Sequence, residues 1–233
     1  MIYNVDARHG LALLPDGSVD GIVSDVPYKT ISGGNAVGKG GLGAYGRPTG
    51  MLAANNGKGG LVHNDIEPEE YASELFRVLS DPGHAWIFVN EHRRRRMEDA
   101  MLAAGFKTHF LAAWIKNNVT PNRWGMKNGE LYFLFRKGAA RTLYNRSMKQ
   151  FQHCDNPVGR KRHPNEKPVG LMRAMVAASS LPGETVLDPF CGAGSVGVAC
   201  QQLGRRFIGF EIDPAHHAVA VSRMATDNEG AFG

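Results

Sequence analysis

Short apolar runs alternate along this chain with segments whose apolar residues repeat every three or four positions. Seven of the runs are short and rich in β-branched or aromatic residues, as buried strands are. They cover residues 2–5, 21–24, 85–89, 109–115, 131–135, 185–187 and 206–210. The pattern therefore predicts a sheet of seven strands.

Four amphipathic helices are expected between these strands. Prolines open two of them, at Pro68 and Pro168, and glycines end the other two, at Gly105 and Gly204. Their apolar stripes are Tyr71, Leu75 and Leu79; Met97, Ala100, Met101 and Ala104; Leu171, Met172, Met175 and Val176; and Val196, Ala199, Cys200 and Leu203. The alternation predicts a doubly wound, mostly parallel α/β sheet covered by helices on both faces.

Length and composition are typical of one globular domain. The chain has 233 residues, of which 42% are hydrophobic, so we expect a single domain over residues 1–233. No apolar run reaches the ~18 residues that span a bilayer, so no membrane association is expected. Cys154, Cys191 and Cys200 form no C-x-x-C pair, which argues against a disulfide framework or a zinc site. We expect a cytoplasmic protein without a bound metal.

Two segments lack apolar periodicity. Residues 32–60 are dense in Gly, Asn and Ala, which predicts a mobile loop, and residues 139–162 are irregular and basic. The whole chain carries 27 Lys and Arg against 22 acids, with a pI near 9.2. A basic balance of this size is compatible with a nucleic-acid partner but does not establish one.

Residues 185–195 run from a strand through a glycine turn into a helix. Gly192 and Gly194 would let the backbone approach a ligand, and the helix N-terminus behind them favours negative charge. Glu211 ends a later strand, at roughly the ~20-residue separation where an acid meets ribose hydroxyls in dinucleotide folds. A tight turn without a ligand is the alternative interpretation of this stretch alone.

Three stretches resemble motifs of the amino-group DNA methyltransferases. Residues 163–168, H-P-N-E-K-P, are similar to the tenth motif of that family, and residues 186–194, V-L-D-P-F-C-G-A-G, to its first. Residues 205–213, R-R-F-I-G-F-E-I-D, resemble the strand that follows, whose acid binds the ribose. The resemblance implies a Rossmann-like methyltransferase fold with S-adenosylmethionine as cofactor.

The same resemblance assigns the cofactor site. The implied cofactor-binding residues are Lys167, Pro168, Asp188, Pro189, Phe190, Cys191, Gly192, Gly194, Ser195 and Glu211. Lys167 and Pro168 would flank the methionine end of the cofactor. Asn165 and Glu166 stand where the family has Thr and Gln, so no side-chain role is carried over to these two positions.

A fourth stretch resembles the motif that holds the target base. Residues 14–28 end in D-V-P-Y, where the family usually has D-P-P-Y, which implies catalytic roles for Asp25, Val26, Pro27 and Tyr28. An aromatic amine is a poor nucleophile because its lone pair is delocalised into the ring. A carboxylate and a backbone carbonyl accepting its two N–H bonds would stabilise charge that develops only in the transition state. Tyr28 would stack on the base once the base has left the duplex.

Val26 replaces the usual proline of this motif. The implied mechanism uses only the carbonyl of this residue, and a residue before proline is held in the extended region, so we expect the function to survive. The alternative is a decayed site, which would leave a catalytically inactive DNA-binding module.

The motif order, catalysis before cofactor, resembles the circularly permuted β group of the family. It predicts that the strands ending at Asp25 and Asp188 are neighbours. The strand ending at Asp6 would lie beside the strand ending at Glu211. Asp6 could then reach the adenine of the cofactor, or it could simply cap a turn. The order also disfavours an RNA or protein methyltransferase.

The resemblance implies methylation of an exocyclic amine in DNA. Adenine is favoured over cytosine N4 because adenine enzymes of the family usually carry an acid at the position of Asp25. Methylation at carbon 5 of cytosine is not expected, because no cysteine follows a proline. DNA contacts are expected from the basic segment, at Arg141, Arg146, Lys149, Arg160, Lys161 and Arg162. Residues 93–96, four arginines, should face water or else phosphate. A homodimer is implied by analogy alone.

Overall fold

The computed structural model describes residues 1–27, 66–122, 125–139, 141–155 and 166–229. The first compact unit comprises residues 1–26 and 67–233, and residues 27–66 are not part of it. The first unit holds the sheet and the helices that pack on it. The glycine-rich segment 32–60 and Tyr28 lie outside the described residues.

The first unit is built on one mostly parallel sheet. Its strands are β1 (Ile2–Asn4), β2 (Val19–Asp25), β3 (Leu79–Val89), β4 (Lys107–Asn122), β5 (Gly125–Lys137), β6 (Phe151–His153), β7 (Thr185–Asp188) and β8 (Arg206–Glu211). The strand order is β1-β8-β7-β2-β3-β5-β4-β6, and β5 runs antiparallel to both of its neighbours. This arrangement confirms the expected fold class.

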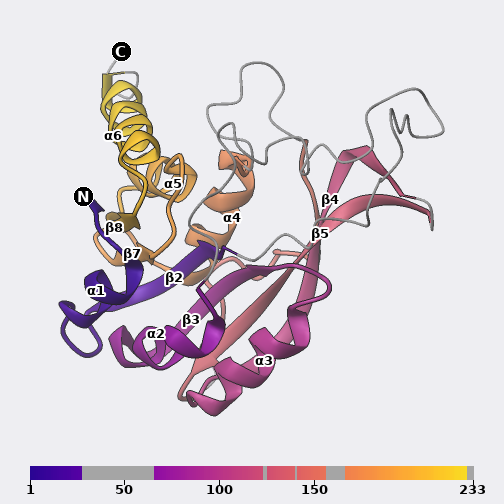
Figure 1. Cartoon of the computed structure of the whole chain (residues 1–233), viewed down its shortest axis with the longest axis horizontal. Helices are drawn as coiled ribbons and strands as arrows, with labels where there is room; N and C mark the ends of the chain where they lie inside the picture. Colours follow the sequence, from indigo (N-terminus) through magenta and orange to yellow (C-terminus); the bar gives the residue numbers. More distant parts are fainter. Residues whose placement is uncertain (28–65, 123–124, 140, 156–165, 230–233) are drawn as a thin grey trace, which may run out of the picture. The chain divides into compact units, whose positions relative to one another are not determined.

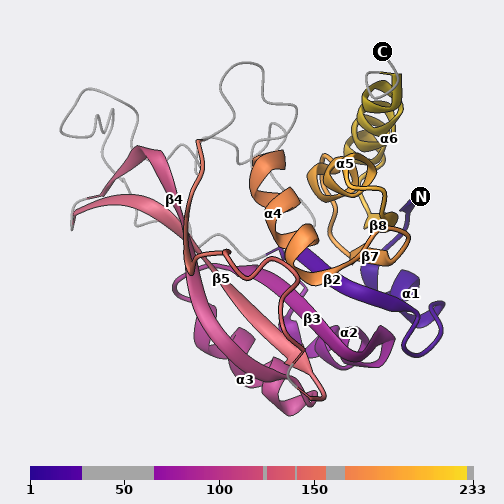
Figure 2. The same cartoon turned by 180° about the vertical axis from the view of Figure 1, so that it is seen from behind.

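Helices cover both faces of this sheet, as expected (Figure 1). They are α1 (Ala7–Ala12), α2 (Ala72–Val78), α3 (Arg94–Ala103), α4 (Val169–Ser179), α5 (Ser195–Gln202) and α6 (Pro214–Glu229). Helices α1, α2 and α3 pack on one face, and α4, α5 and α6 pack on the other, as the view from behind also shows (Figure 2).

Three features differ from the sequence expectation. Helices α1 and α6 were not among the four expected helices. The sheet has an eighth strand, β6, which lies in the basic segment and pairs with the edge of β4. Its three residues are partly exposed and carry no apolar run, so periodicity could not reveal it. Leu79 does not belong to the helix that follows Pro68, because the helix ends at Val78 and Leu79 begins β3. Leu79 is fully buried. A buried apolar residue fits both the stripe of a helix and the start of a strand, so the sequence pattern did not separate the two.

The main core lies between the sheet and helices α4 and α5. Its large side chains include Trp86, Phe88, Trp114, Tyr132, Met172 and Met175. Trp114 is almost fully buried, and its ring N–H donates to the Cys154 carbonyl at 2.7 Å. Trp114 therefore anchors β4 to the segment that follows β6, as expected of a core residue.

Candidate active site

The carboxyl ends of the central strands bring the two predicted halves of the site together. β2 pairs in parallel with β7, so Asp25 and Asp188 end adjacent strands. β1 pairs in parallel with β8, with Asn4 opposite Glu211. Both predicted neighbour relations are confirmed. In open α/β sheets, ligands bind at this kind of edge, where the strand order reverses.

The turn between β7 and α5 has the backbone shape of an anion- or nucleotide-binding loop. Gly192 and Gly194 have φ values of 49° and 75°, which side chains disfavour. A Cβ added at Gly194 would also lie 3.2 Å from the Cβ of Ala220 on α6. The backbone N–H of Gly192 donates to Oε2 of Glu211 at 2.9 Å, and the Asp213 N–H donates to Oε1 at 2.9 Å. The turn and the acid at the end of β8 thus form one hydrogen-bonded structure.

Asp188 is held by neutral donors. The Ser24 hydroxyl donates to its Oδ1 at 2.7 Å, and the Phe190 backbone N–H donates to the same oxygen at 3.1 Å. The side chain is almost fully buried, and this burial raises the pKa of Asp188 to about 7, although the two hydrogen bonds lower it. Ser24 therefore links β2 to the start of the turn between β7 and α5 (the cofactor turn).

Asp25 is held instead by a charged group. The Lys167 ammonium contacts Oδ2 of Asp25 and lies 3.1 Å from Oε2 of Glu130 on β5. Glu130 also pairs with Lys116 on β4. The pKa of Asp25 lies above its ordinary value, because desolvation raises it most, Lys167 lowers it in part, and Glu130 raises it. The cluster of two acids and two amines thus draws on β2, on the consecutive strands β4 and β5, and on the residue before Pro168.

A second buried ion pair connects the H-P-N-E-K-P stretch to the cofactor turn. Oε1 of Glu166 lies 2.9 Å from the guanidinium of Arg223 on α6. Arg223 also donates to the Ala193 carbonyl and to the Ser195 hydroxyl, both at 3.1 Å. Glu166 and Arg223 expose only 9% and 7% of their side chains, so the ion pair is shielded from water. Through Arg223, it connects Glu166 and the turn between β7 and α5 to helix α6.

The remaining predicted residues have visible structural roles. Asp6 caps α1 by accepting the Arg8 backbone N–H at 2.8 Å, and its carboxylate also pairs with the Arg8 guanidinium. Pro168 is the N-cap residue of α4. The half-exposed Phe190 ring meets the buried Tyr71 ring edge-on, with the centroids 5.1 Å apart. A cofactor role for Asp6, Pro168 and Phe190 stays a prediction.

Three further residues of the two motifs are buried. The side chains of Pro189 and Cys191, next to Phe190, and of Val26, after β2, lie inside the protein. The backbone N–H of Cys191 donates to the Phe210 carbonyl at 2.9 Å, which fastens the turn to β8.

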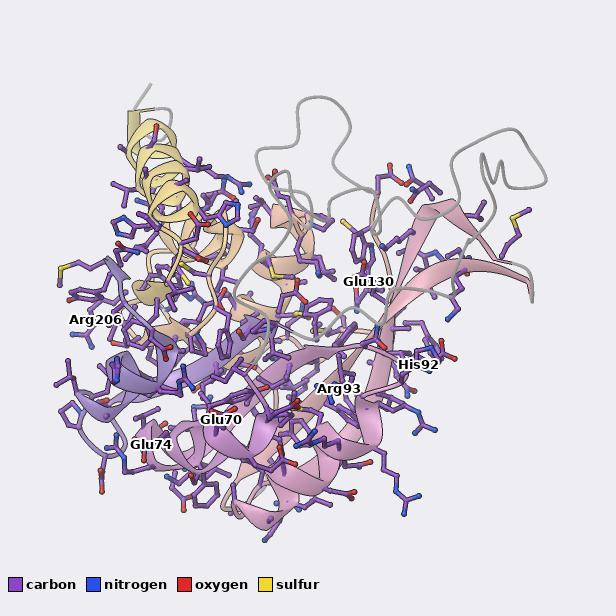
Figure 3. All side chains as sticks on the ribbon, in the orientation of Figure 1. Glu70, Glu74, His92, Arg93, Glu130 and Arg206 are labelled. Carbon is purple, nitrogen blue, oxygen red and sulfur yellow. The ribbon has the colours of Figure 1, made fainter. Side chains whose placement is uncertain are left out.

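The arginine run at the start of α3 is largely neutralised. Arg93 and Arg96 pair with Glu67, and Arg96 also pairs with Glu69 (Figure 3 labels Arg93). Arg95 keeps 90% of its side chain exposed, which matches a solvated face. In the basic segment, Arg141 donates to the Ser179 carbonyl at 2.5 Å, while Arg146 and Lys149 are exposed. Arg160, Lys161 and Arg162 lie outside the described residues.

This doubly wound sheet, with a glycine turn after one strand and an acid after the next, defines a nucleotide-cofactor-binding α/β enzyme. Comparison with known proteins narrows the class. The family model described as DNA methylase, for N6 and N4 methyltransferases, matches residues 19–222. The chain therefore belongs to this family of DNA methyltransferases, a class that uses S-adenosylmethionine.

Relatives and solved structures agree over almost the whole chain. The Type II methyltransferase M2.DpnII of Streptococcus pneumoniae is 28% identical, covering 98% of this chain and 91% of its own. The crystal structure of the M1.HpyAVI–SAM complex has a TM-score of 0.70 at 22% identity, covering 96% of this chain and 98% of its own. The cytosine-N4-specific PvuII DNA methyltransferase has a TM-score of 0.69 at 14% identity, covering 98% and 89%. At these identities the two structures support the fold alone.

Sequence reasoning assigned no role at the site to Glu130, Lys116, Tyr71 or Arg223. Glu130 and Lys116 each adjoin a predicted strand, at the border of an apolar run, which was the only signal they gave. Their pairing depends on the β4–β5 register, in which Trp114 is opposite Glu130.

None of the helices in the described part of the chain combines the length and hydropathy that a bilayer span requires.

Proposed function

We propose that this protein transfers a methyl group from S-adenosylmethionine to the exocyclic amine of a DNA base, with adenine N6 as the target. The observation that carries the proposal is the adjacency of β2 and β7. It sets the Asp25 carboxylate, an acceptor for the amine, beside the strand that leads into the cofactor turn. The two reactants would then meet at one edge of the sheet.

The groups of the site match the chemistry of the cofactor. The carboxylate of Glu211 suits ribose hydroxyls, and the N-terminus of α5 behind Gly192 and Gly194 suits the methionine carboxylate. When bound, S-adenosylmethionine supplies a methyl group that is activated by a positively charged sulfur. Lys167 and Pro168, before α4, would flank this end of the site.

The protein residues act on the base. Asp25 and the carbonyl of Val26 accept the two N–H bonds of the amine, so that its lone pair points at the methyl group. As the methyl group passes from sulfur to nitrogen, the Asp25 carboxylate would accept the proton that the methylated amine loses and would release it to water. The interaction is stronger in the transition state than with the bound base, and it therefore accelerates the reaction.

Adenine is proposed over cytosine because Asp25 is an acid where cytosine-N4 enzymes of the family more often carry serine. A carboxylate accepts from either amine, so this preference rests on family habit. The fold does not separate the two, since a cytosine-N4-specific enzyme shares it. The Type II relative supports a role in a restriction-modification system.

Methylated plasmid DNA tests the proposal. Purified protein is incubated with plasmid and labelled S-adenosylmethionine, and the DNA is digested to nucleosides and separated by mass. We expect N6-methyl-2′-deoxyadenosine in the wild-type reaction and none with Asp25→Ala. N4-methylcytosine alone would overturn the choice of base but not the reaction. No methylated base, despite cofactor binding, would support the inactive DNA-binding module instead.

A further inference from the structure

The cluster around Lys167 alternates in charge across four segments of the chain. Lys167, before α4, contacts Asp25 on β2 and Glu130 on β5, and Glu130 contacts Lys116 on β4 (Figure 3 labels Glu130). Two ammonium groups thus face two carboxylates. When all four groups are ionised the cluster has no net charge, which lets charged groups persist in a partly dry site.

Lys167 is the most buried member of this cluster. It exposes 7% of its side chain, against 27% for Asp25, 32% for Glu130 and 19% for Lys116. Removing an ammonium from water is costly unless carboxylates surround it, and here one lies on each side. The Phe88 ring, with its centroid 5.2 Å from Nζ, adds a cation–π contact. The amine is therefore held in place from three directions.

Glu130 is held just as firmly from its far side. The Lys116 ammonium contacts its Oε1 and lies 4.8 Å from the centroid of the Trp114 ring, which is itself buried in the core. Burial raises the pKa of Glu130, but Lys167 and Lys116 outweigh it, so that the pKa ends below its usual range. Glu130 therefore stays an anion and keeps Lys167 at the end of β2.

This arrangement bears directly on Asp25. An acceptor for two N–H bonds works best as a carboxylate, yet desolvation at the end of β2 favours the neutral acid. Because Lys167 engages Oδ2, the second oxygen, Oδ1, can accept from the base. The ammonium thus supplies charge without occupying the whole carboxylate.

We propose that Lys167, Glu130 and Lys116 are positioning residues for methyl transfer: Lys167 keeps Asp25 an oriented, ionised acceptor for the target amine, and Glu130, itself held by Lys116, keeps Lys167 in place. The proposal rests on the proposed function through the role of Asp25. It assigns Lys167 to the base half of the site and not primarily to the cofactor. It also gives a function to two strand residues outside the recognised motifs.

The test is the pH dependence of kcat/KM for DNA in matched variants. Lys167→Met removes the cation that lowers the pKa of Asp25, so the acidic limb of the pH profile should move up by about one pH unit, and activity at a pH below that limb should fall ~10-fold. Glu130→Gln removes an anion that raises it, so the limb should move the opposite way, with a smaller loss of kcat. Lys167→Arg keeps the charge and should stay within ~5-fold of the wild type.

The charged groups facing Asp25 make the opposite shifts specific. They are Lys167 before α4, Glu130 on β5, Lys116 on β4 and Asp188 on the adjacent β7. A merely structural role would lower activity in both variants without moving the limb in opposite directions. Glu74→Gln is the control, because Glu74 is a similarly exposed (33%) acid paired with Arg77 on α2, and it should change neither limb nor rate.

Two readouts separate the possible failures. Cofactor affinity, measured by calorimetry, should change less than ~3-fold in Lys167→Met and Glu130→Gln; a large loss without a shifted limb would overturn the proposal and return Lys167 to the cofactor. If Lys167→Met does not fold, Lys167→Arg and Glu130→Asp keep the test open, since both should stay active.

If the wild type methylates no DNA, the proposed function fails. The cluster is then tested by following the ionisation of the Asp25 carboxyl by infrared spectroscopy as pH changes. The signal of Asp25 is the difference between the spectra of the wild type and of Asp25→Asn. A titration that Glu130→Gln leaves unmoved would overturn the proposal.

Discussion

Two aspartates on adjacent strands of this sheet are held in opposite ways. Asp188, at the end of β7, accepts from a hydroxyl and a backbone N–H, both neutral. Asp25, at the end of β2, contacts the ammonium of Lys167, which in turn faces Glu130. The cofactor half of the site is thus organised mainly by hydrogen bonds near its own turn, and the base half by charges from distant segments.

The difference suits the two tasks. A neutral frame fixes the shape of a turn and tolerates a protonated Asp188, whose burial raises its pKa to about 7. An acceptor for a reacting amine needs its charge, and a nearby cation such as Lys167 favours that charge against desolvation. The comparison therefore predicts that changes at Asp25 alter catalysis and that changes at Asp188 alter stability and its pH dependence.

Replacing Asp25 should have the largest effect. Asp25→Ala removes an interaction made at the base, so we expect a loss of at least ~1,000-fold in kcat/KM, with cofactor affinity within a few fold of the wild type. Methyl-transfer kinetics and calorimetry provide the two measurements. Equal losses of cofactor affinity and activity would show that Asp25 belongs to the cofactor half.

Asp188→Asn should change the pH dependence of the free energy of unfolding. The folded pKa near 7 lies above the ordinary value of 3.8, so this aspartate favours folding at low pH and loses that contribution as pH rises to about 7. Between pH 5 and pH 8 the cofactor-free wild type should lose about 2–3 kcal/mol that the variant keeps. Urea unfolding at both pH values measures this. Identical pH dependence in the two proteins would remove the contrast between the aspartates.

Gly194→Ala should weaken cofactor binding by about tenfold. A left-handed φ of 75° costs an alanine about 1–2 kcal/mol, and its Cβ would press on Ala220, so the turn must shift. Gly204→Ala is the matched control, since Gly204 has a φ of 69° at the other end of α5 and open space around it. The control should lose similar stability but keep its cofactor affinity. If both variants bind the cofactor equally well, the turn does not hold it.

The smallest effects are expected on DNA binding. Arg146→Ala with Lys149→Ala removes two exposed charges from the basic segment, which should weaken DNA binding ~5-fold and lower the slope of log affinity against log salt by roughly two. Arg95→Ala, in the largely neutralised run, should change either quantity little. Filter binding at several salt concentrations distinguishes the two segments. A larger effect at Arg95 would place the DNA against α3 instead.

The sequence alone determined the features that depend on neighbouring residues. Apolar periodicity located the strands β1–β5, β7 and β8, because a buried strand must be apolar wherever it lies. The glycine turn was also recognisable from neighbouring residues, because the local backbone shape requires glycine at positions 192 and 194. The order of the motifs then predicted which strands are neighbours, and both pairings are present.

The tertiary structure alone decided which side chains meet. Lys167 could have faced the cofactor, but the fold places it between Asp25 and Glu130. Glu166 departs from the family motif, and its partner Arg223 lies on a helix that no sequence pattern linked to it. Such pairings depend on strand register and helix packing over tens of residues. A charged residue beside an apolar run has the same local sequence whether it faces water or completes a buried cluster.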